Sequence, residues 1–235
     1  MNGIQVSVVI PAYNAEDTLA GTLDSVHAQT RPANEIIVID DGSEDRTAEI
    51  ATGHISGPRV ISTSNHGSAA ALNHGIEEAS CTILAFVDAD DIWTENKLEL
   101  QTGFLSMQPD TGFILSHMEA FVCPSVSEET RNSLVFPAGP QPGYLIGTMM
   151  ARRDVFRKHG MFDTELRTGY FIDWFSRMKS RSVQYTMLDE ILLKRRVRPG
   201  TLGQRSNASD QISSDFVEIA RRAIARKRNN RSGIP

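Results

Sequence analysis

The chain has 235 residues, of which 40% are hydrophobic, and it carries a formal net charge of −5 with a sequence pI near 5.7. This length and composition suit one sizeable α/β domain with a C-terminal extension, and the acidic charge argues against a nucleic-acid-binding protein. The sequence has no run of about 18 apolar residues that would predict a membrane span, and its N-terminus lacks the features of a secretory signal. Cys81 and Cys123 form no CxxC pair, which is typical of free thiols, so we expect a cytoplasmic protein.

Short runs rich in Ile and Val alternate with helical patterns in the first part of the chain. The runs predict four buried strands, at residues 4–10, 35–39, 59–63 and 82–87. Asn14 is in position to cap the first helix. Two helices are predicted by apolar residues spaced three or four positions apart, namely Leu19, Leu23 and Val26, and then Ala69, Leu72, Ile76 and Ala79. Strand–helix alternation of this kind predicts βαβ units and a mostly parallel sheet flanked by helices.

The rest of the chain is less regular. Its predicted elements are, in chain order, a helix at 95–107, a strand at 111–122, a loop at 123–147, a helix on Val155 and Phe156 that stops at Gly160, a helix on Phe171, Trp174, Phe175 and Met178, a strand at 182–196, and a tail helix on Ile212, Phe216 and Ile219. Trp93 and Leu98 are predicted to be core residues. We therefore expect one domain over 1–205, with a smaller C-terminal region from 101, and a helix with a basic tail over 206–235.

Polar residues follow each of the four predicted strands of the N-terminal half. These segments are PAYN (11–14), DDGSEDRT (40–47), NHG (65–67) and DADD (88–91). Ligands of parallel α/β sheets bind beyond the carboxyl ends of the strands, so the segments are expected to meet at one edge of the sheet. Their convergence predicts a binding site at that edge.

The DADD segment places Asp88, Asp90 and Asp91 directly after an apolar run. Two carboxylates ~4 Å apart repel by ~4 kcal/mol at an effective dielectric constant of about 20, so a divalent cation is the first candidate for their role. Side chains two apart at a strand end point the same way, so Asp88 and Asp90 can face one cation while Asp91 points elsewhere. The alternative is that the three residues only cap the following helix.

Asp40, Asp41 and Tyr13 have the same two interpretations. The acidic pair could simply shape a βα turn, or a carboxylate could accept a hydrogen bond from a base N–H or a ribose hydroxyl. Tyr13 could pack against the protein or stack on that base.

Taken together, the N-terminal segments closely resemble, in order and spacing, family 2 glycosyltransferases of the GT-A fold. They are VSVVIPAYNAEDTLAGTLDSVHAQT, EIIVIDDGSEDRT, NHGSAAALNHGIEEAS and ILAFVDADDIWTENKL. The resemblance is strong over 4–100, looser over 145–200, and weak or absent over 101–145 and beyond about 205. It implies a GT-A fold with a donor-binding half over 1–100 and an acceptor-binding half over 101–205. It also implies a nucleotide-sugar donor, with a UDP-sugar expected first, and we expect a soluble acceptor because no membrane span is predicted.

The resemblance also assigns residues by position. Those implied for the nucleobase are Pro11, Ala12, Tyr13 and Asp41. Asp88 would reach the ribose or a metal, and Asp90 would ligate Mg²⁺ or Mn²⁺ that bridges the diphosphate. An oxygen-ligated divalent metal neutralises the charge that develops on such a leaving group.

Members of the family that this chain resembles invert the anomeric centre, with a carboxylate as general base. The matching position is Asp173 in the YFIDWF segment, where Ile172 replaces the Glu that many members have. General-base assistance is typically worth about 10²–10⁴-fold in rate. The alternative is that Asp173 forms a helix-surface ion pair with Arg177 at i, i+4.

Two basic regions remain. Relatives often have a histidine near the position of Arg198, which could instead bind phosphate oxygens or belong to a solvated strand end with Lys194, Arg195 and Arg196. The tail carries six basic residues, Arg221, Arg222, Arg226, Lys227, Arg228 and Arg231, and a solvated helix is their expected structure.

Two rival functions follow from the same residues. Ile172 and the missing histidine also suit a catalytically inactive GT-A domain that binds nucleotide as a scaffold. Aspartates at strand ends are also typical of aspartate-phosphorylating enzymes, but those usually have acidic residues after the first strand, where this chain has PAYN. A metal-dependent, inverting glycosyltransferase is therefore the expected function.

Overall fold

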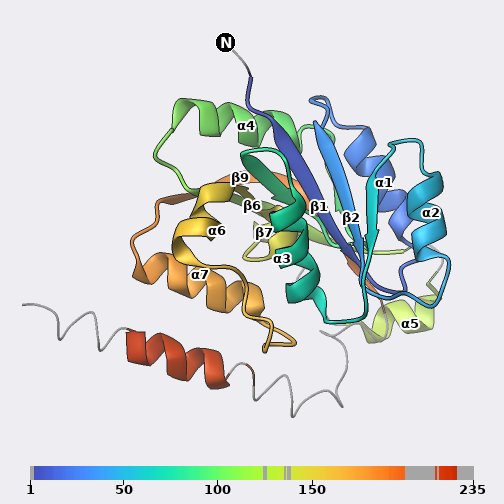
Figure 1. Ribbon diagram of the computed structural model, residues 1–235. Helices are drawn as coiled ribbons and strands as arrows, with labels where there is room; N and C mark the ends of the chain where they lie inside the picture. The colour runs from blue at the N-terminus through green and yellow to red at the C-terminus, as the bar shows by residue number, and fades with distance from the viewer. Residues whose placement is uncertain are drawn as a thin grey trace, which may run out of the picture.

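The computed structural model describes residues 3–123, 126–134, 136, 139–198, 215 and 217–226 (Figure 1). A nine-stranded sheet runs through the molecule in the order β3-β2-β1-β4-β8-β6-β9-β5, with β7 paired to β6. The strands are β1 (Val6–Ala12), β2 (Glu35–Asp40), β3 (Arg59–Ser62), β4 (Ile83–Phe86), β5 (Ile92–Trp93), β6 (Phe113–Val122), β7 (Gln141–Pro142), β8 (Met150–Arg152) and β9 (Tyr185–Val197). The helices are α1 (Leu19–His27), α2 (Thr47–Gly53), α3 (Ser68–Glu78), α4 (Lys97–Met107), α5 (Glu128–Ser133), the 3₁₀ helix η1 (Ile146–Thr148), α6 (Arg153–His159) and α7 (Tyr170–Ser180).

Most of the sheet is parallel, as predicted. β1 pairs in parallel with β2 and β4, β2 with β3, and β6 with β9. β8 lies antiparallel between β4 and β6, while β5 and β7 run antiparallel to β9 and β6. β6 and β9 therefore run in the same direction as β1, β2, β3 and β4.

Two hydrophobic clusters pack on opposite faces of the sheet. Along β1, Val8 and Ile10 point to one cluster and Val9 points to the other, because side chains alternate across a strand. The first cluster includes apolar residues of α1, α2 and α4, and the second includes those of α3, α6 and α7. Figure 1 shows the same division, with α3, α6 and α7 on the near side of the sheet.

The four N-terminal strands and the helices predicted between them are confirmed to within about two residues at most of their ends. The predicted cap is wrong, because α1 begins after Thr18 and not near Asn14. Asn14 has a left-handed backbone (φ 47°), its N–H donates to Ser43 Oγ (2.9 Å), and its Oδ1 accepts from Glu44 N–H (2.9 Å). It therefore joins the loops that follow β1 and β2.

The C-terminal half has more structure than predicted. α5 and β7 lie within the segment expected to be a loop at 123–147, η1 overlaps its end, and β8 was not predicted. The helix that stops at Gly160, the helix containing Trp174 and the strand β9 are confirmed. In the described part of the chain, no helix combines the length and the apolar character that a membrane-spanning segment needs.

The last described residues, 215 and 217–226, form the C-terminal helical segment. Ile219, one of the apolar residues on which the tail helix was predicted, is buried, whereas Ile212 and Phe216 lie outside the described residues. Figure 1 shows the segment, in red, beside α7.

Candidate functional site

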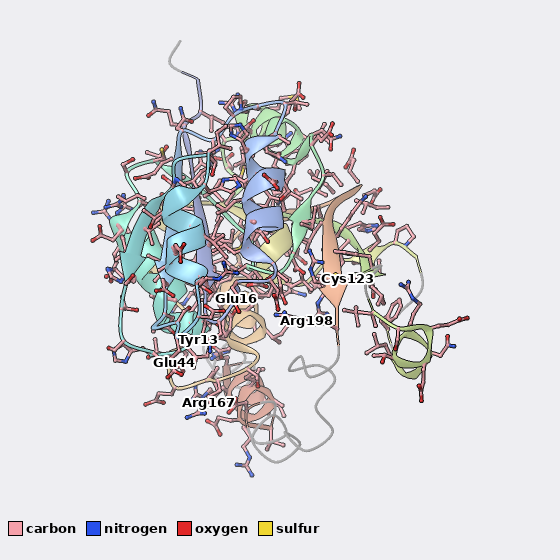
Figure 2. The ribbon with its side chains drawn as sticks, turned by 90° about the vertical axis from the view of Figure 1, so that its right-hand side faces the viewer. Tyr13, Glu16, Glu44, Cys123, Arg167 and Arg198 are labelled. Carbon is pink, nitrogen blue, oxygen red and sulfur yellow. The ribbon has the colours of Figure 1, made fainter. Side chains whose placement is uncertain are left out.

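The ends of β1, β2 and β4 meet at one edge of the sheet. Ala12 lies opposite Asp40 in the β1–β2 register, and Val9 lies opposite Phe86 in the β1–β4 register. The segments that follow these strands therefore start side by side, as the polar clusters in the sequence predict. Tyr13 projects at this end of the molecule with 50% of its surface exposed (Figure 2).

Asp41 is buried and organises the loop after β3. Its Oδ1 accepts from the N–H of His66 (2.9 Å) and the hydroxyl of Thr63 (3.3 Å), and its Oδ2 accepts from the N–H of Gly67 (2.7 Å). An ionised carboxylate has about four lone-pair sites, so these three donors leave capacity for another partner. Asp40, also buried, accepts from Ser43 N–H and Ser62 Oγ and supports the turn.

The acidic segment forms a turn beyond β4. β4 ends at Phe86, so Asp88 and Asp90 do not lie on the strand, and the predicted strand-end geometry is wrong. The N–H of Asp91 donates to the carbonyl of Asp88 (3.1 Å) and closes the turn. Asp88 and Asp90 remain half-buried neighbours, whereas Asp91 is 3% exposed.

The crowded carboxylates have perturbed pKa values. Burial and the charge of Asp90 raise the pKa of Asp88 to about 7. Burial and the charges of Asp88 and Asp90 raise the pKa of Asp91 well above its usual value. A positive charge placed beside the turn would favour the ionised forms.

β9 brings arginines to this turn. The N–H of Arg196 donates to Asp91 Oδ1 (2.8 Å), and its Nε donates to the carbonyl of Asp90 (2.7 Å). Nη2 of Arg198 lies 3.4 Å from Asp90 Oδ2, and both side chains are partly exposed. Asp91 therefore anchors β9 and does not cap α4, whose N-cap is Asn96. Of the arginines expected at a solvated strand end, only Arg195 is exposed.

The donor set at the turn suits a cation that shares its ligands with a substrate. Among the described residues, no group of three or more His, Cys, Asp or Glu side chains could hold a metal by itself. Mg²⁺ is usually held by one or two carboxylates together with substrate phosphates and waters. The two half-buried carboxylates of Asp88 and Asp90 match that requirement.

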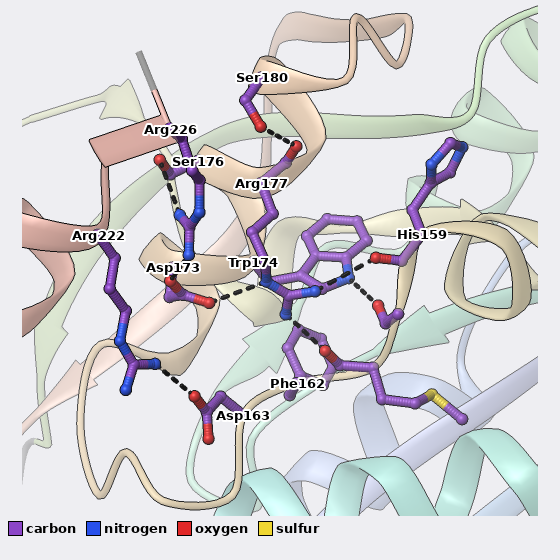
Figure 3. Close-up of polar contacts among 12 residues, drawn as sticks. His159, Phe162, Asp163, Asp173, Trp174, Ser176, Arg177, Ser180, Arg222 and Arg226 are labelled. Atoms are coloured by element: carbon purple, nitrogen blue, oxygen red, sulfur yellow. Dashed lines mark hydrogen bonds and ion pairs between the residues drawn. The ribbon is translucent and has the colours of Figure 1, made fainter. Parts of the chain in front are cut away.

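Asp173 lies in the first turn of α7 and is only 1% exposed. Its Oδ2 accepts from Nε of Arg177 (2.9 Å), and its Oδ1 accepts from Nη2 of Arg226 (2.7 Å), as Figure 3 shows. The ion pair with Arg177 is thus present but buried, and not the surface pair considered from the sequence. Its neighbour Trp174 is fully buried and donates from Nε1 to the carbonyl of Gly160 (3.1 Å).

Sequence reasoning missed several residues near the site. Tyr170 opens α7, and burial together with the charge of Asp88 raises the pKa of its hydroxyl. Arg222 pairs with Asp163 (2.6 Å) and Arg226 with Asp173, so these two tail arginines are not the solvated residues that were expected. Arg222 also pairs with Glu218 at i, i+4 (2.8 Å), a local spacing that the sequence shows, but no local pattern indicated the distant partners Asp163 and Asp173. Lys227, Arg228 and Arg231 lie outside the described residues.

Comparison with known proteins agrees with this arrangement. Residues 7–179 match Glycosyl transferase family 2. An uncharacterized glycosyltransferase of Rickettsia typhi is 31% identical over 206 residues, which cover 82% of this chain and 64% of that protein, so the chain spans slightly less than two thirds of this relative. The Escherichia coli UDP-Glc:alpha-D-GlcNAc-diphosphoundecaprenol beta-1,3-glucosyltransferase WfgD is 38% identical over 108 residues, or 45% of this chain and 42% of that protein.

Among solved structures, S. aureus TarS 1-349 in complex with UDP-GlcNAc superposes with a TM-score of 0.72. The alignment covers 95% of this chain and 66% of that chain at 20% sequence identity, which shows a shared fold and confirms the expected GT-A architecture. Because the family match extends over most of the sequence, the chain belongs to Glycosyl transferase family 2.

Proposed function

We propose that the chain transfers a sugar from a nucleoside-diphosphate donor to an acceptor hydroxyl with inversion at the anomeric carbon. The observation that carries the proposal is the acidic turn Asp88–Asp91, which lies beside the loops after β1 and β2 at the carboxyl edge of the sheet. The TarS structure contains UDP-GlcNAc, and the name of WfgD specifies UDP-Glc as its donor. A UDP-sugar is therefore the first donor to test.

Recognition of the base is assigned to the loop after β1 and to Asp41. Pro11 and Ala12 are buried and fix the backbone, and the exposed ring of Tyr13 is available for stacking. Stacking of a base on an aromatic side chain is worth about 1–3 kcal/mol in single-stranded nucleic-acid complexes. The remaining acceptor capacity of Asp41 suits a base N–H.

Binding of the donor diphosphate is assigned to the acidic turn and the end of β9. Asp88 and Asp90 would hold Mg²⁺ or Mn²⁺, which supplies positive charge to the departing diphosphate when bound. The guanidinium of Arg198, beside Asp90, can hydrogen-bond phosphate oxygens through its planar fork. Arg196 keeps the turn in place through the carbonyl of Asp90.

Removal of the proton from the acceptor hydroxyl is assigned to Asp173. In a single displacement the acceptor oxygen bonds to the anomeric carbon, the bond from that carbon to the diphosphate oxygen breaks, and the acceptor proton passes to the Asp173 carboxylate. Arg177 donates to one oxygen of this carboxylate and fixes its orientation. An Asp173→Asn variant should lose turnover and still bind the donor, because ground-state contacts to the nucleotide remain.

A nucleotide-binding scaffold without turnover is the second candidate. The observation that favours it is the double pairing of Asp173, which leaves neither oxygen without an arginine. Both candidates bind a nucleotide sugar, but only the first releases the sugar from it.

A thermal-shift screen with UDP-, GDP- and dTDP-sugars, with and without Mn²⁺, tests donor binding. A ligand at ~100 times its dissociation constant adds ~2.7 kcal/mol of stability, which such a screen detects. Mass spectrometry of the nucleotide products then separates the enzyme from the scaffold. The proposal fails if no nucleotide sugar stabilises the protein in either condition.

A further inference from the structure

The C-terminal helical segment is attached to the region around Asp173 at three points. Oδ2 of Asp215 accepts from the N–H and the hydroxyl of Thr168 (both 3.0 Å), in the loop before α7. Arg222 donates to Asp163 in the same loop (2.6 Å), and Arg226 donates to Asp173 (2.7 Å). Figure 3 shows both arginines reaching from the segment to their carboxylates. The segment therefore lies over the carboxylate assigned as the base.

The two arginines on Asp173 are held very differently. Arg177 also donates to the carbonyls of His159 (3.3 Å) and Met161 (2.5 Å), so it is built into the turn before α7. Arg226 has Asp173 as its close partner, and its contact with Ser176 Oγ, at 3.5 Å, is too long for a strong hydrogen bond. Arg226 is thus the partner that can leave without disturbing α7.

Asp173 also has to become accessible to act on an acceptor. A general base must lie within about 2.6–3.2 Å of the oxygen whose proton it takes. The side chain of Asp173 is 2% exposed while Arg226 is in place, which leaves no room for an acceptor hydroxyl. If Arg226 withdraws, Oδ1 loses its partner, whereas Arg177 still orients the carboxylate through Oδ2.

We propose that Arg226 controls the access of the acceptor to Asp173. Arg226 covers the Asp173 carboxylate in the resting protein and moves away from it when an acceptor binds. The inference rests on the proposed role of Asp173 as the base. The Arg222–Asp163 pair is partly exposed on both sides (31% and 26%), and such pairs contribute little to stability. Arg226 is 24% exposed and covers a carboxylate that is 2% exposed. Because Arg177 still pairs with Asp173 when Arg226 leaves, the carboxylate is not left without a positive partner, and the segment can open without unfolding the domain.

Carboxyl labelling measures this access directly, with a carbodiimide, glycine ethyl ester and mass spectrometry on the full chain. Arg226→Ala should increase the labelling rate of Asp173 several-fold over that of the wild-type protein, and Arg226→Lys, which keeps the charge, should restore most of the protection. The matched control is Arg221→Ala, because Arg221 is exposed on the same segment and lies about 140° around the helix from Arg226. Asp41 is buried and lies far from Asp173 and Arg226 in the sequence, so its labelling serves as an internal reference for an intact fold.

Two further readouts connect access to chemistry. With donor alone, Arg226→Ala should hydrolyse the nucleotide sugar faster than the wild-type protein, since water then reaches Asp173, and the added Asp173→Asn change should abolish that gain. Equal labelling of Asp173 in Arg226→Ala and Arg221→Ala, with Asp41 still protected, would overturn the inference. Failure of the proposed function has a different signature: no variant releases nucleotide from any donor, while the labelling pattern still decides whether Arg226 covers Asp173.

Discussion

Gly75 provides a sharp test of how α3 packs on the sheet that carries the site. A Cβ atom built on Gly75 would lie 2.3 Å from Cγ1 of Val9 and 3.4 Å from Cγ1 of Ile39. Carbon atoms in favourable contact are about 3.5–4.0 Å apart, so Gly75→Ala forces α3 and β1 to separate by more than about 1 Å. Val9 cannot yield easily, because it is fully buried and its branched side chain has few accessible rotamers.

The expected size of the effect follows from two opposing contributions. Replacing a helical Gly by Ala gains about 1 kcal/mol through helix propensity. Overpacking a well-filled core costs about 1–3 kcal/mol, and a contact as short as 2.3 Å indicates the upper end of that range. We therefore expect Gly75→Ala to lower the free energy of unfolding by about 2 kcal/mol, which corresponds to a fall of about 4–8 °C in Tm for a chain of this size.

Gly103→Ala in α4 is the matched control. Gly103 is also inside a helix, but it is exposed and a Cβ there would meet no atom within 4 Å. That variant should gain about 0.5–1 kcal/mol from helix propensity alone. Urea unfolding of both variants gives the comparison. If Gly75→Ala proves as stable as Gly103→Ala, α3 does not pack against β1 as described.

Three other substitutions test separate parts of the molecule. Burial lowers the pKa of Lys97 well below its usual value near 10.5, so the unfolded chain holds a proton that the folded chain lacks between those two pKa values. The stability of the wild-type protein relative to Lys97→Met should therefore fall by about 1.4 kcal/mol for each unit by which pH decreases through that window. Urea titrations of both proteins at about pH 8, 9 and 10 measure this difference, and a difference that stays constant would contradict the prediction. Asp41→Asn places an amide opposite the N–H groups of His66 and Gly67, so at least one of these N–H groups loses its bond to the buried carboxylate, and the free energy of unfolding should fall by about 1–3 kcal/mol. Unchanged urea melts would show that the loop does not depend on the carboxylate. Asp90→Asn should abolish turnover and weaken Mn²⁺-dependent donor binding in the thermal-shift screen, and kinetics like those of the wild-type protein would remove Asp90 from the site.

The N-terminal half of the fold was predictable because its signals are local. β1, β2 and β4 are runs of buried Val and Ile, and the polar residues that follow them reach the same edge by the geometry of parallel strands. β5, β7 and β8 have two or three residues each, too few to display the alternation that identifies a strand. The turn at Asp88–Asp91 shows the same limit, since the residue types were informative and the local geometry was not.

The region around Asp173 depends on contacts between distant parts of the chain, which no short pattern encodes. Asp173 meets Arg226 across 53 positions, and it is only 1% exposed. Its spacing from Arg177 predicted an ion pair correctly but gave no information about solvent exposure. A carboxylate expected to face an acceptor is instead enclosed by two arginines.

Buried polar contacts also join the acidic turn and α4 to η1. Trp93, just after the acidic turn, donates from Nε1 to the carbonyl of Gly147 (3.0 Å) in η1. Lys97 and Gln101, one turn apart on α4, both donate to the carbonyl of Thr148 (2.9 Å each). Lys97 resembles a surface residue in sequence, yet it is fully buried, so each of these groups depends on its partners being in place. Since η1 follows the segment that was expected to be a loop, a change that shifts this segment must either break those buried bonds or move the helix that follows Asp88 and Asp90. The position of the acidic turn and that of η1 are therefore coupled through α4.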